Sequence, residues 1–251
     1  MRALASAWDD SRVNYKASVG VMLRLLPCNF QGRTPCMSSH RIIAIDGPAA
    51  SGKSSVALAL ARRLGFSYVN SGAMYRAVTW YVLQRSVDVH EPTAVVAAVE
   101  QSKIVCELVD NQSRILIDDH DPTSHLRDDN VNRAVSIVSS IPRVRQILVP
   151  QMRECAKANN VVMEGRDIGS VVFPETPFKF YVDASPEVRV QRRRAEGQRD
   201  EIAARDRADS SRAASPLIVA PDAEVIDTST LTIDGVVNEI MRRLKQKGLS
   251  I

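Results

Sequence analysis

A glycine-rich run from Gly47 to Ser54, GPAASGKS, carries the residues with the clearest chemistry in this sequence. It matches the pattern G-x-x-x-x-G-K-[ST], in which backbone N–H groups surround the phosphates of a nucleoside triphosphate. Lys53 can neutralise the β- and γ-phosphates, and the Ser54 hydroxyl can ligate Mg²⁺. We therefore predict a loop that binds a triphosphate with Mg²⁺, formed by Gly47, Pro48, Ala49, Ala50, Ser51, Gly52, Lys53, Ser54 and Ser55.

The elements around this loop agree with that interpretation. The residues from Arg41 to Asp46 are mostly Ile and Ala, which is typical of a buried parallel strand. Residues 56–65, VALALARRLG, have the apolar spacing of a helix and end at a glycine. A strand, the motif and a helix in this order are the context of a P-loop, and they disfavour the alternative of a chance glycine-rich turn.

Two later segments carry side chains suited to a phosphorylated acceptor. In residues 66–76, FSYVNSGAMYR, a short strand is predicted to lead into a helix that holds Ser71 and Arg76 near its start. Another buried strand, beginning at Val161, ends in the polar set Glu164, Gly165, Arg166 and Asp167. Residues just beyond the carboxyl ends of parallel strands line the ligand crevice, and an arginine fork holds a phosphate. Taken alone, these segments also fit a solvated helix arginine and an exposed ion pair in a turn.

The segment from Val188 to Arg212 is dense in arginine, with acidic residues between them. It begins within a predicted helix that has Ser185 as its N-cap and Pro186 as its first residue. A nucleic-acid patch is one interpretation, but the segment contains no aromatic residue on which bases could stack. A mobile lid over a triphosphate is favoured, because arginines stabilise the charge that develops in phosphoryl transfer.

The remaining pattern predicts an insert and the end of an α/β domain. The insert covers residues 87–160, with a β-hairpin over 103–110 and 114–119 and helices at 127–139 and 142–158. After the insert we predict a fourth strand beginning at residue 178, a fifth strand at 222–229 and an amphipathic helix at 232–248. An insert on the acceptor side is well placed to recognise the acceptor.

Composition sets the broad limits. The chain has 251 residues, 45% of them hydrophobic, and a formal charge of +4, which suits one domain with an insert acting on phosphorylated ligands or nucleic acid. Four cysteines without ligand spacing indicate reduced thiols in a cytoplasmic protein, and no apolar run reaches the roughly 20 residues of a membrane span. Residues 1–36 are predicted to be an extension without a fold of its own, and Met37 is proposed as the natural start of the 37–251 domain.

Taken together, the motifs resemble those of the bacterial cytidylate kinase family over about residues 40–248. The segments that carry the resemblance are IDGPAASGKSS, NSGAMYRA, IPRVR, EGRDIGSVVFP, DASPEVR and RDRADSSRAASPL. The resemblance implies a five-stranded parallel sheet flanked by helices, an acceptor-binding insert and a lid at about 188–206. It also implies transfer of the γ-phosphoryl group of ATP to CMP or dCMP with Mg²⁺, by a monomer that binds neither nucleic acid nor membrane.

The same resemblance implies roles for individual residues. The cytosine ring is expected to be surrounded by Ser71, Arg145, Asp167 and Arg212, and the ribose by Ser136, Arg205 and Asp209. The acceptor phosphate is expected to lie between Arg76 and Arg166, so that the catalytic set is Lys53, Arg76, Arg166 and Asp167. The spacing of Arg205, Asp209 and Arg212 predicts that all three share one helix face. Arg192 and Arg194 are the lid arginines expected at the transferred phosphoryl group.

Two departures and two rival functions accompany this interpretation. Many members of the family have Gly-Thr after the P-loop lysine, where this chain has Ser54 and Ser55, and the stretch from Arg194 to Arg205 is shorter than in some relatives. One rival is a P-loop kinase for another nucleoside monophosphate or for shikimate. The other is a nucleotide-dependent protein that binds nucleic acid, which the basic composition favours and the lack of stacking aromatics disfavours.

Overall fold

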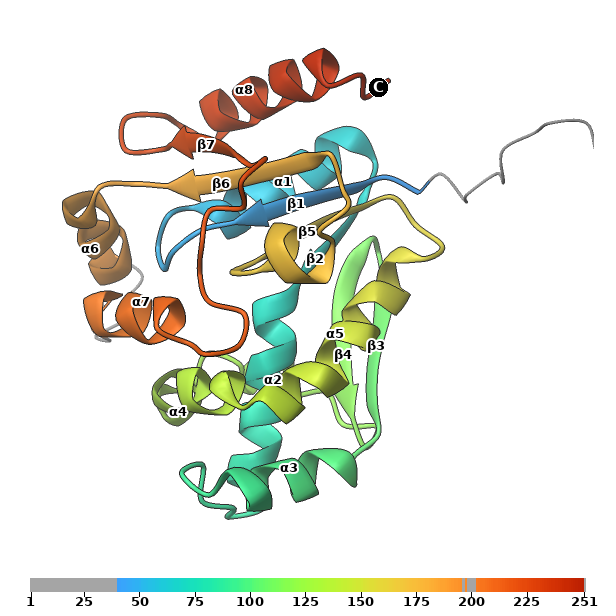
Figure 1. Ribbon diagram of the computed structural model, residues 1–251, viewed down its shortest axis with the longest axis vertical. Coiled ribbons are helices and arrows are strands. Elements are labelled where there is room, and N and C mark those ends of the chain that lie inside the picture. The colour runs from blue at the N-terminus through green and yellow to red at the C-terminus, as the bar shows by residue number, and fades with distance from the viewer. Residues whose placement is uncertain (1–39, 196, 198–201, 251) are drawn as a thin grey trace, which may run out of the picture. The chain divides into compact units, whose positions relative to one another are not determined.

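The computed structural model describes residues 40–195, 197 and 202–250. The predicted extension over residues 1–36 and the proposed start at Met37 therefore lie outside the described residues. Within them, the strands form a sheet in the order β3-β4-β2-β5-β1-β6-β7 (Figure 1). The neighbours from β2 to β7 pair in parallel: β2 Ser67–Asn70, β5 Val161–Gly165, β1 Ile42–Asp46, β6 Phe178–Asp183 and β7 Glu224–Asp227. The predicted five-stranded parallel α/β core is thus confirmed.

The central strands read as continuous apolar runs because both of their faces are covered. Ile43 and Ile45 of β1 belong to a core shared with helices α1 (Lys53–Leu64) and α8 (Ile233–Gln246). Ala44, which lies between them, belongs to a second core with helices α2 (Ser71–Gln84) and α5 (Pro142–Ala156). Successive side chains of a strand point to opposite faces, so a strand between two helical layers needs apolar residues at every position.

The sheet is wider than predicted because the hairpin of the insert joins it. Strands β3 (Ile104–Val109) and β4 (Gln112–Ile117) are antiparallel, and Asp110 and Asn111 between them have φ values of 51° and 59°. Positive φ at both central residues is the signature of a type I′ turn. β4 then pairs in parallel with the edge of β2, through the partners Tyr68 and Gln112. The predicted number of five strands is therefore wrong for the whole sheet, which has seven strands in the described residues.

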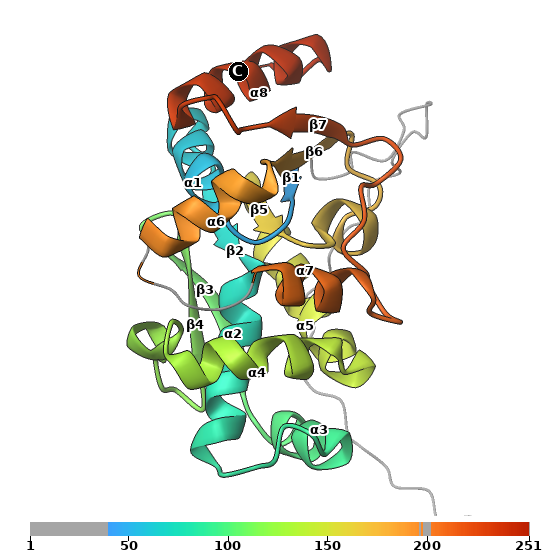
Figure 2. The ribbon, with the colours of Figure 1, turned by 90° about the vertical axis from the view of Figure 1, so that its left-hand side faces the viewer.

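Further helices come from the predicted insert and from the predicted lid. The predicted insert contains the two expected helices, α4 (Asp129–Ser140) and α5, and also α3 (Pro92–Glu100), which was not predicted from the sequence. Helices α6 (Pro186–Ala195) and α7 (Ile202–Ser210) follow β6. Figures 1 and 2 both show α7 lying between α6 and α4. In the described part of the chain, no helix combines the length and the apolar character that a membrane span requires.

Candidate active site

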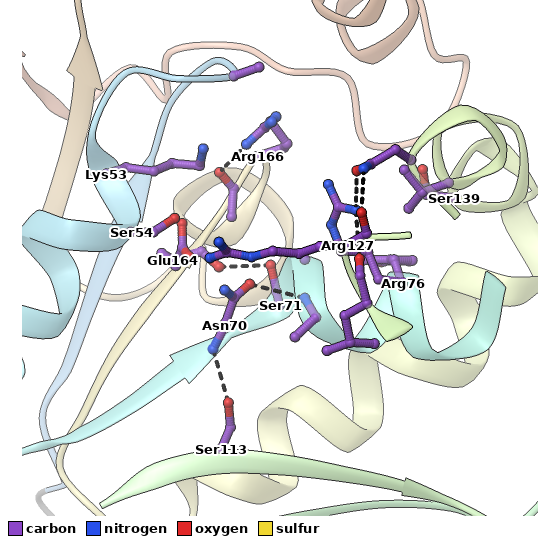
Figure 3. Close-up of a pocket in the computed structure, with 18 of the residues that line it drawn as sticks. Lys53, Ser54, Asn70, Ser71, Arg76, Ser113, Arg127, Ser139, Glu164 and Arg166 are labelled. Atoms are coloured by element: carbon purple, nitrogen blue, oxygen red, sulfur yellow. Dashed lines mark hydrogen bonds between the residues drawn. The ribbon is translucent and has the colours of Figure 1, made fainter. Parts of the chain in front are cut away.

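A cavity of about 700 Å³ lies where the P-loop, the carboxyl ends of β2 and β5, the insert and the lid helices meet (Figure 3). This volume falls within the usual range of roughly 300–1,000 Å³ for small-molecule sites. One wall is made by the P-loop and the start of α1, and the opposite wall by α2, α4 and α5. The structure thus brings the predicted triphosphate side and the predicted acceptor side to one space.

The P-loop conformation depends on two glycines. Gly52, the N-cap of α1, has a φ of 88°, in the left-handed region that glycine adopts without strain. At Gly47 an added Cβ would lie 2.0 Å from the carbonyl oxygen of Val182 on β6, so no larger residue fits there. Of the nine predicted loop residues, the cavity wall includes Ala49, Ala50, Gly52, Lys53, Ser54 and Ser55. Gly47, Pro48 and Ser51 lie outside that wall.

Lys53 is buried at the floor of the P-loop wall. Lys53 is only 7% exposed, and its Nζ donates to the carbonyl oxygen of Pro48 at 3.1 Å. Burial, assisted by the nearby charge of Arg166 and opposed by that of Glu164, lowers the pKa of Lys53 to about 7. A buried ammonium gains from an anionic partner, and the phosphates of a bound nucleotide would supply one.

A carboxylate on the neighbouring strand fits a hard cation. Glu164 of β5 is 2% exposed and accepts a hydrogen bond of 2.9 Å from the Tyr68 hydroxyl. Burial, together with the Glu164 carboxylate, raises the pKa of Tyr68, which keeps the phenol a donor. Glu164 and the Ser54 hydroxyl both line the cavity. One hydroxyl and one carboxylate suit Mg²⁺, which retains waters and phosphate oxygens as its other ligands.

Asp46, the last residue of β1, fixes the turn that follows β5. It is 6% exposed, and its two carboxylate oxygens accept the backbone N–H groups of Ile168 at 2.8 Å and Gly169 at 2.7 Å. Burial raises the pKa of Asp46 to about 6 against the effect of these bonds. The two N–H groups belong to a π-helical turn, Ile168–Val172, that begins directly after Asp167.

Arg145 and Asp167 form a buried ion pair on the acceptor wall. Both side chains are 4% exposed, and the Arg145 Nη2 donates to the Asp167 carboxylate. The Arg145 Nη1 donates to the carbonyl oxygen of Ser139 at 3.0 Å, and its guanidinium lies 5.0 Å from the ring centre of Tyr75. The Arg145 Nε and the Tyr75 hydroxyl have no hydrogen-bond partner among the described residues. This wall therefore offers unused donors beside a carboxylate.

A second buried cluster of charges joins Arg166, which follows β5, to helix α7 through Asp209. Its carboxylate accepts from Arg166 Nε at 2.8 Å and from Arg212 Nη2, which also donates to Ser139 Oγ at 2.9 Å. Burial disfavours the charged form of Asp209, but the charges of Arg166 and Arg212 outweigh it and lower its pKa. The prediction that Arg205, Asp209 and Arg212 share a helix face is wrong for Arg212, because α7 ends at Ser210. Arg212 reaches Asp209 from the segment that follows the helix.

Of the other predicted acceptor residues, three line the cavity and one does not. Ser71 and Arg205 line the cavity, and the Ser71 hydroxyl donates to the Glu164 carbonyl oxygen at 2.8 Å. Arg76 also lines it, while its Nη1 donates to Leu126 O at 2.9 Å and to Asn132 Oδ1 at 2.6 Å. Ser136 does not belong to the wall, which instead includes Ser139 on the next turn of α4.

Helices α6 and α7, which contain parts of the predicted lid, contact the P-loop through side chains. Asp206 of α7 accepts the Ala49 N–H at 3.1 Å and forms an ion pair with Arg189 of α6, which donates to Ala49 O at 3.2 Å. Arg192 donates to Ser51 O at 3.1 Å and to Thr228. The lid arginine on the wall next to it is Arg193. The assignment of Arg192 and Arg194 to the transferred phosphoryl group stays a prediction.

Several residues of the cavity wall were not predicted from the sequence. Tyr68 and Asn70 lie on β2 just before Ser71, and their position at the carboxyl end of a predicted strand could have revealed them. Gln112 and Ser113 enter the wall because the hairpin joins the sheet. Arg127, in the polar segment before α4, belongs to no motif that could have singled it out.

The parallel sheet, the P-loop at the start of α1 and the arginine-rich cavity define a P-loop phosphotransferase. The family model "Cytidylate kinase" matches residues 43–246. A cytidylate kinase from Nocardia farcinica is 43% identical over 218 residues, which cover 82% of this chain and 94% of that protein. Cytidylate kinases from Pelotomaculum thermopropionicum and Enterococcus faecalis are each 42% identical over 83% of this chain and 97% of their own length. The chain belongs to the cytidylate kinase family.

Proposed function

We propose that this protein transfers the γ-phosphoryl group of ATP to CMP or dCMP, giving ADP and CDP or dCDP. The single observation that carries the proposal is the cavity, in which a P-loop faces the buried Arg145–Asp167 pair across one space. Membership of the cytidylate kinase family supports the same reaction. The chain is thus a nucleoside monophosphate kinase.

On the donor side, the P-loop amides and the N-terminus of α1 would hold the phosphates of ATP. Lys53 would give its charge to the β- and γ-phosphates, and the nucleotide would in turn favour the protonated amine. Ser54 and Glu164 are the residues that would hold Mg²⁺, directly or through water, and the ion would neutralise the charge on the phosphates. Asp206 and Arg189 support this geometry by holding Ala49 from both sides.

On the acceptor side, the donors and the carboxylate suit a cytosine ring. Cytosine carries an amine donor beside two acceptors, N3 and O2. We propose that Asp167 accepts from the amine while Arg145, Arg212 and Ser71 serve the acceptor edge. The buried donors of this wall support the role, because a base without matching acceptors would leave the Arg145 Nε and the Tyr75 hydroxyl without partners. Arg205 and Asp209 would serve the ribose, whereas Ser136, which lies outside the cavity wall, is not proposed as a contact.

The reaction itself needs no covalent intermediate. An oxygen of the acceptor phosphate forms the new P–O bond as the bond between the γ-phosphorus and the ADP oxygen breaks. The attacking phosphate is already ionised, so no proton has to be removed by a base. Arg76 and Arg166 would hold it in line, and the arginines would spread the charge of the transition state. The predicted lid at 188–206 would exclude water, which would otherwise accept the phosphoryl group.

An ADP-release assay with ATP and Mg²⁺ tests the proposal against CMP, dCMP, UMP, AMP, GMP and shikimate. Rapid turnover restricted to CMP and dCMP is expected. Turnover with another acceptor would preserve the P-loop argument but overturn the roles given to Ser71, Arg145, Asp167 and Arg212. Absence of turnover with every acceptor would favour the rival nucleic-acid-binding function, for which a salt-dependent shift of labelled RNA is the direct measurement. Lys53→Ala is the control, since it should abolish transfer to any acceptor.

We further propose that the protein acts as a monomer in the cytoplasm and that residues 87–160 form its acceptor-binding insert. Support for a monomer comes from the cavity, in which one chain supplies both the P-loop and the acceptor wall. Cys106 and Cys155 are free thiols in the described part of the chain, which agrees with a reducing compartment. Light scattering of the purified protein at several concentrations would test the oligomeric state.

A further inference from the structure

Positive charge exceeds negative charge on the cavity wall. Eight lysine and arginine side chains line it against three carboxylates, so the wall is built for a strongly anionic ligand. The three carboxylates are already engaged: Asp167 with Arg145, Asp209 with Arg166 and Arg212, and Glu164 with a tyrosine hydroxyl. Neither the ion pairs nor the hydrogen bond of these carboxylates involves Arg127.

Arg127 differs from the other arginines of the wall. Each of those has an interaction partner, whereas the Arg127 guanidinium makes no hydrogen bond or ion pair with any residue between 40 and 250 that the structure describes. Its side chain is exposed, and Figure 3 shows it directed into the cavity. A cation that lines a ligand site without a protein partner is available to the ligand.

The backbone at Arg127 is nevertheless held in place. Asn132 Nδ2 donates to the Arg127 carbonyl oxygen at 2.9 Å, and Arg76 Nη1 donates to the Leu126 carbonyl oxygen at 2.9 Å. Two residues earlier, the His125 ring stacks on Trp80 of α2 with centroids 5.8 Å apart. These contacts anchor the segment to α2 and α4, so the free guanidinium extends from a fixed point on the acceptor side.

We propose that Arg127 binds the phosphate of the acceptor nucleotide together with Arg76. The inference rests on the proposed kinase function and adds a residue of the insert to the acceptor-phosphate site. The hydrogen bond from Arg76 to Leu126 places the two arginines on adjoining segments of one wall. An arginine fork gives paired, charge-assisted hydrogen bonds to a phosphate, which is a dianion near neutral pH. The donor phosphates, by contrast, belong to the P-loop on the opposite wall.

The test compares CMP with cytidine, which has the same base and ribose but no phosphate. Calorimetry would measure the affinities for CMP, cytidine and ADP, using competition titrations where binding is weak. The four proteins compared are the wild type, Arg127→Met, Arg127→Lys and Arg133→Met. Arg133 is the matched control because it is an exposed arginine of α4 that does not line the cavity. We expect Arg127→Met to lower the affinity for CMP about tenfold or more and to leave the affinities for cytidine and ADP unchanged. Arg127→Lys should recover part of the loss, and Arg133→Met should match the wild type.

Three results would overturn the proposal. Loss of CMP affinity no greater than in Arg133→Met would make Arg127 a solvated surface residue. Equal losses of affinity for CMP and cytidine would mean that the substitution disturbs the base pocket. A loss of affinity for ADP alone would assign Arg127 to the site of the phosphoryl donor. Failure of the proposed function would look different: the wild-type protein would bind another monophosphate in place of CMP. The comparison of that monophosphate with its nucleoside would then decide on Arg127.

Discussion

Binding of a nucleotide to the P-loop is expected to take up a proton at Lys53. Burial, and then the neighbouring charge of Arg166, lowers the pKa of Lys53 from 10.5 to about 7 in the nucleotide-free protein. A triphosphate brings negative charge to the amine and favours its ammonium form, so the pKa rises on binding. The complex then holds more protons than its separate components between about pH 7 and the raised pKa of the bound state.

The size of the effect follows from the two pKa values. At pH 8, a group with a pKa of about 7 is roughly one-tenth protonated, and with its ordinary pKa restored it is almost fully protonated. Uptake from Lys53 should therefore be about 0.9 proton per nucleotide at pH 8, and binding should weaken by close to tenfold per unit of pH above that. In the empty protein the unfolded chain binds the extra proton between about pH 7 and 10.5, so the contribution of Lys53 to folding stability rises with pH there.

Calorimetry at pH 8 measures this uptake directly. The heat of ATP binding in the presence of EDTA would be compared in two buffers with different heats of protonation, since the terminal phosphate is already ionised at this pH. Lys53→Arg is the matched control, because a guanidinium stays protonated and should bind ATP without proton uptake. Binding heats that do not depend on the buffer, or the same uptake in Lys53→Arg, would refute the reasoning.

Three further predictions concern the acceptor pocket, the lid and the P-loop. Asp167→Asn should lower kcat/KM for CMP by about 100-fold while ATP affinity by calorimetry changes little, and equal losses would assign Asp167 to the metal. Asp206→Ala should raise the KM for ATP about tenfold, because Ala49 loses its carboxylate partner; an unchanged KM would leave that contact without a role in binding. Gly47→Ala should cost more than about 2 kcal/mol of unfolding free energy in urea, since its Cβ meets Val182; an unshifted midpoint would contradict this.

Local patterns were sufficient for the elements that carry the donor site. The apolar run of β1, the glycines of the loop and the helical spacing of α1 lie within 25 consecutive residues, and each is governed by short-range rules. The same holds for the hairpin turn at Asp110 and Asn111, whose residue types favour positive φ. The five-stranded parallel core was implied by the strand pattern and by the resemblance to a known family, and it is confirmed, whereas the order of its strands was not predicted.

Features that depend on distant contacts were not predictable in this way. Nothing in the hairpin sequence indicates that Gln112 pairs with Tyr68, so the width of the sheet was underestimated. The spacing of Arg205, Asp209 and Arg212 predicted one continuous helix, but serines at positions 210 and 211 compete with helical hydrogen bonding, and α7 ends at Ser210. Arg127 has ordinary neighbours in sequence, and only the fold brings it to the cavity.

The carboxylate at the end of β1 also has a consequence for internal motion. β1 leads directly into the P-loop, and Asp46 at its end holds the π-helical turn that follows Arg166 and Asp167. A displacement of β1 therefore carries the donor loop and part of the acceptor wall in the same direction. Fluctuations of the sheet become common to both substrates, and the gap across which the phosphoryl group moves is insulated from them. Phosphoryl transfer tolerates only small errors in alignment, so it benefits when the donor loop and this part of the acceptor wall are both attached to one strand.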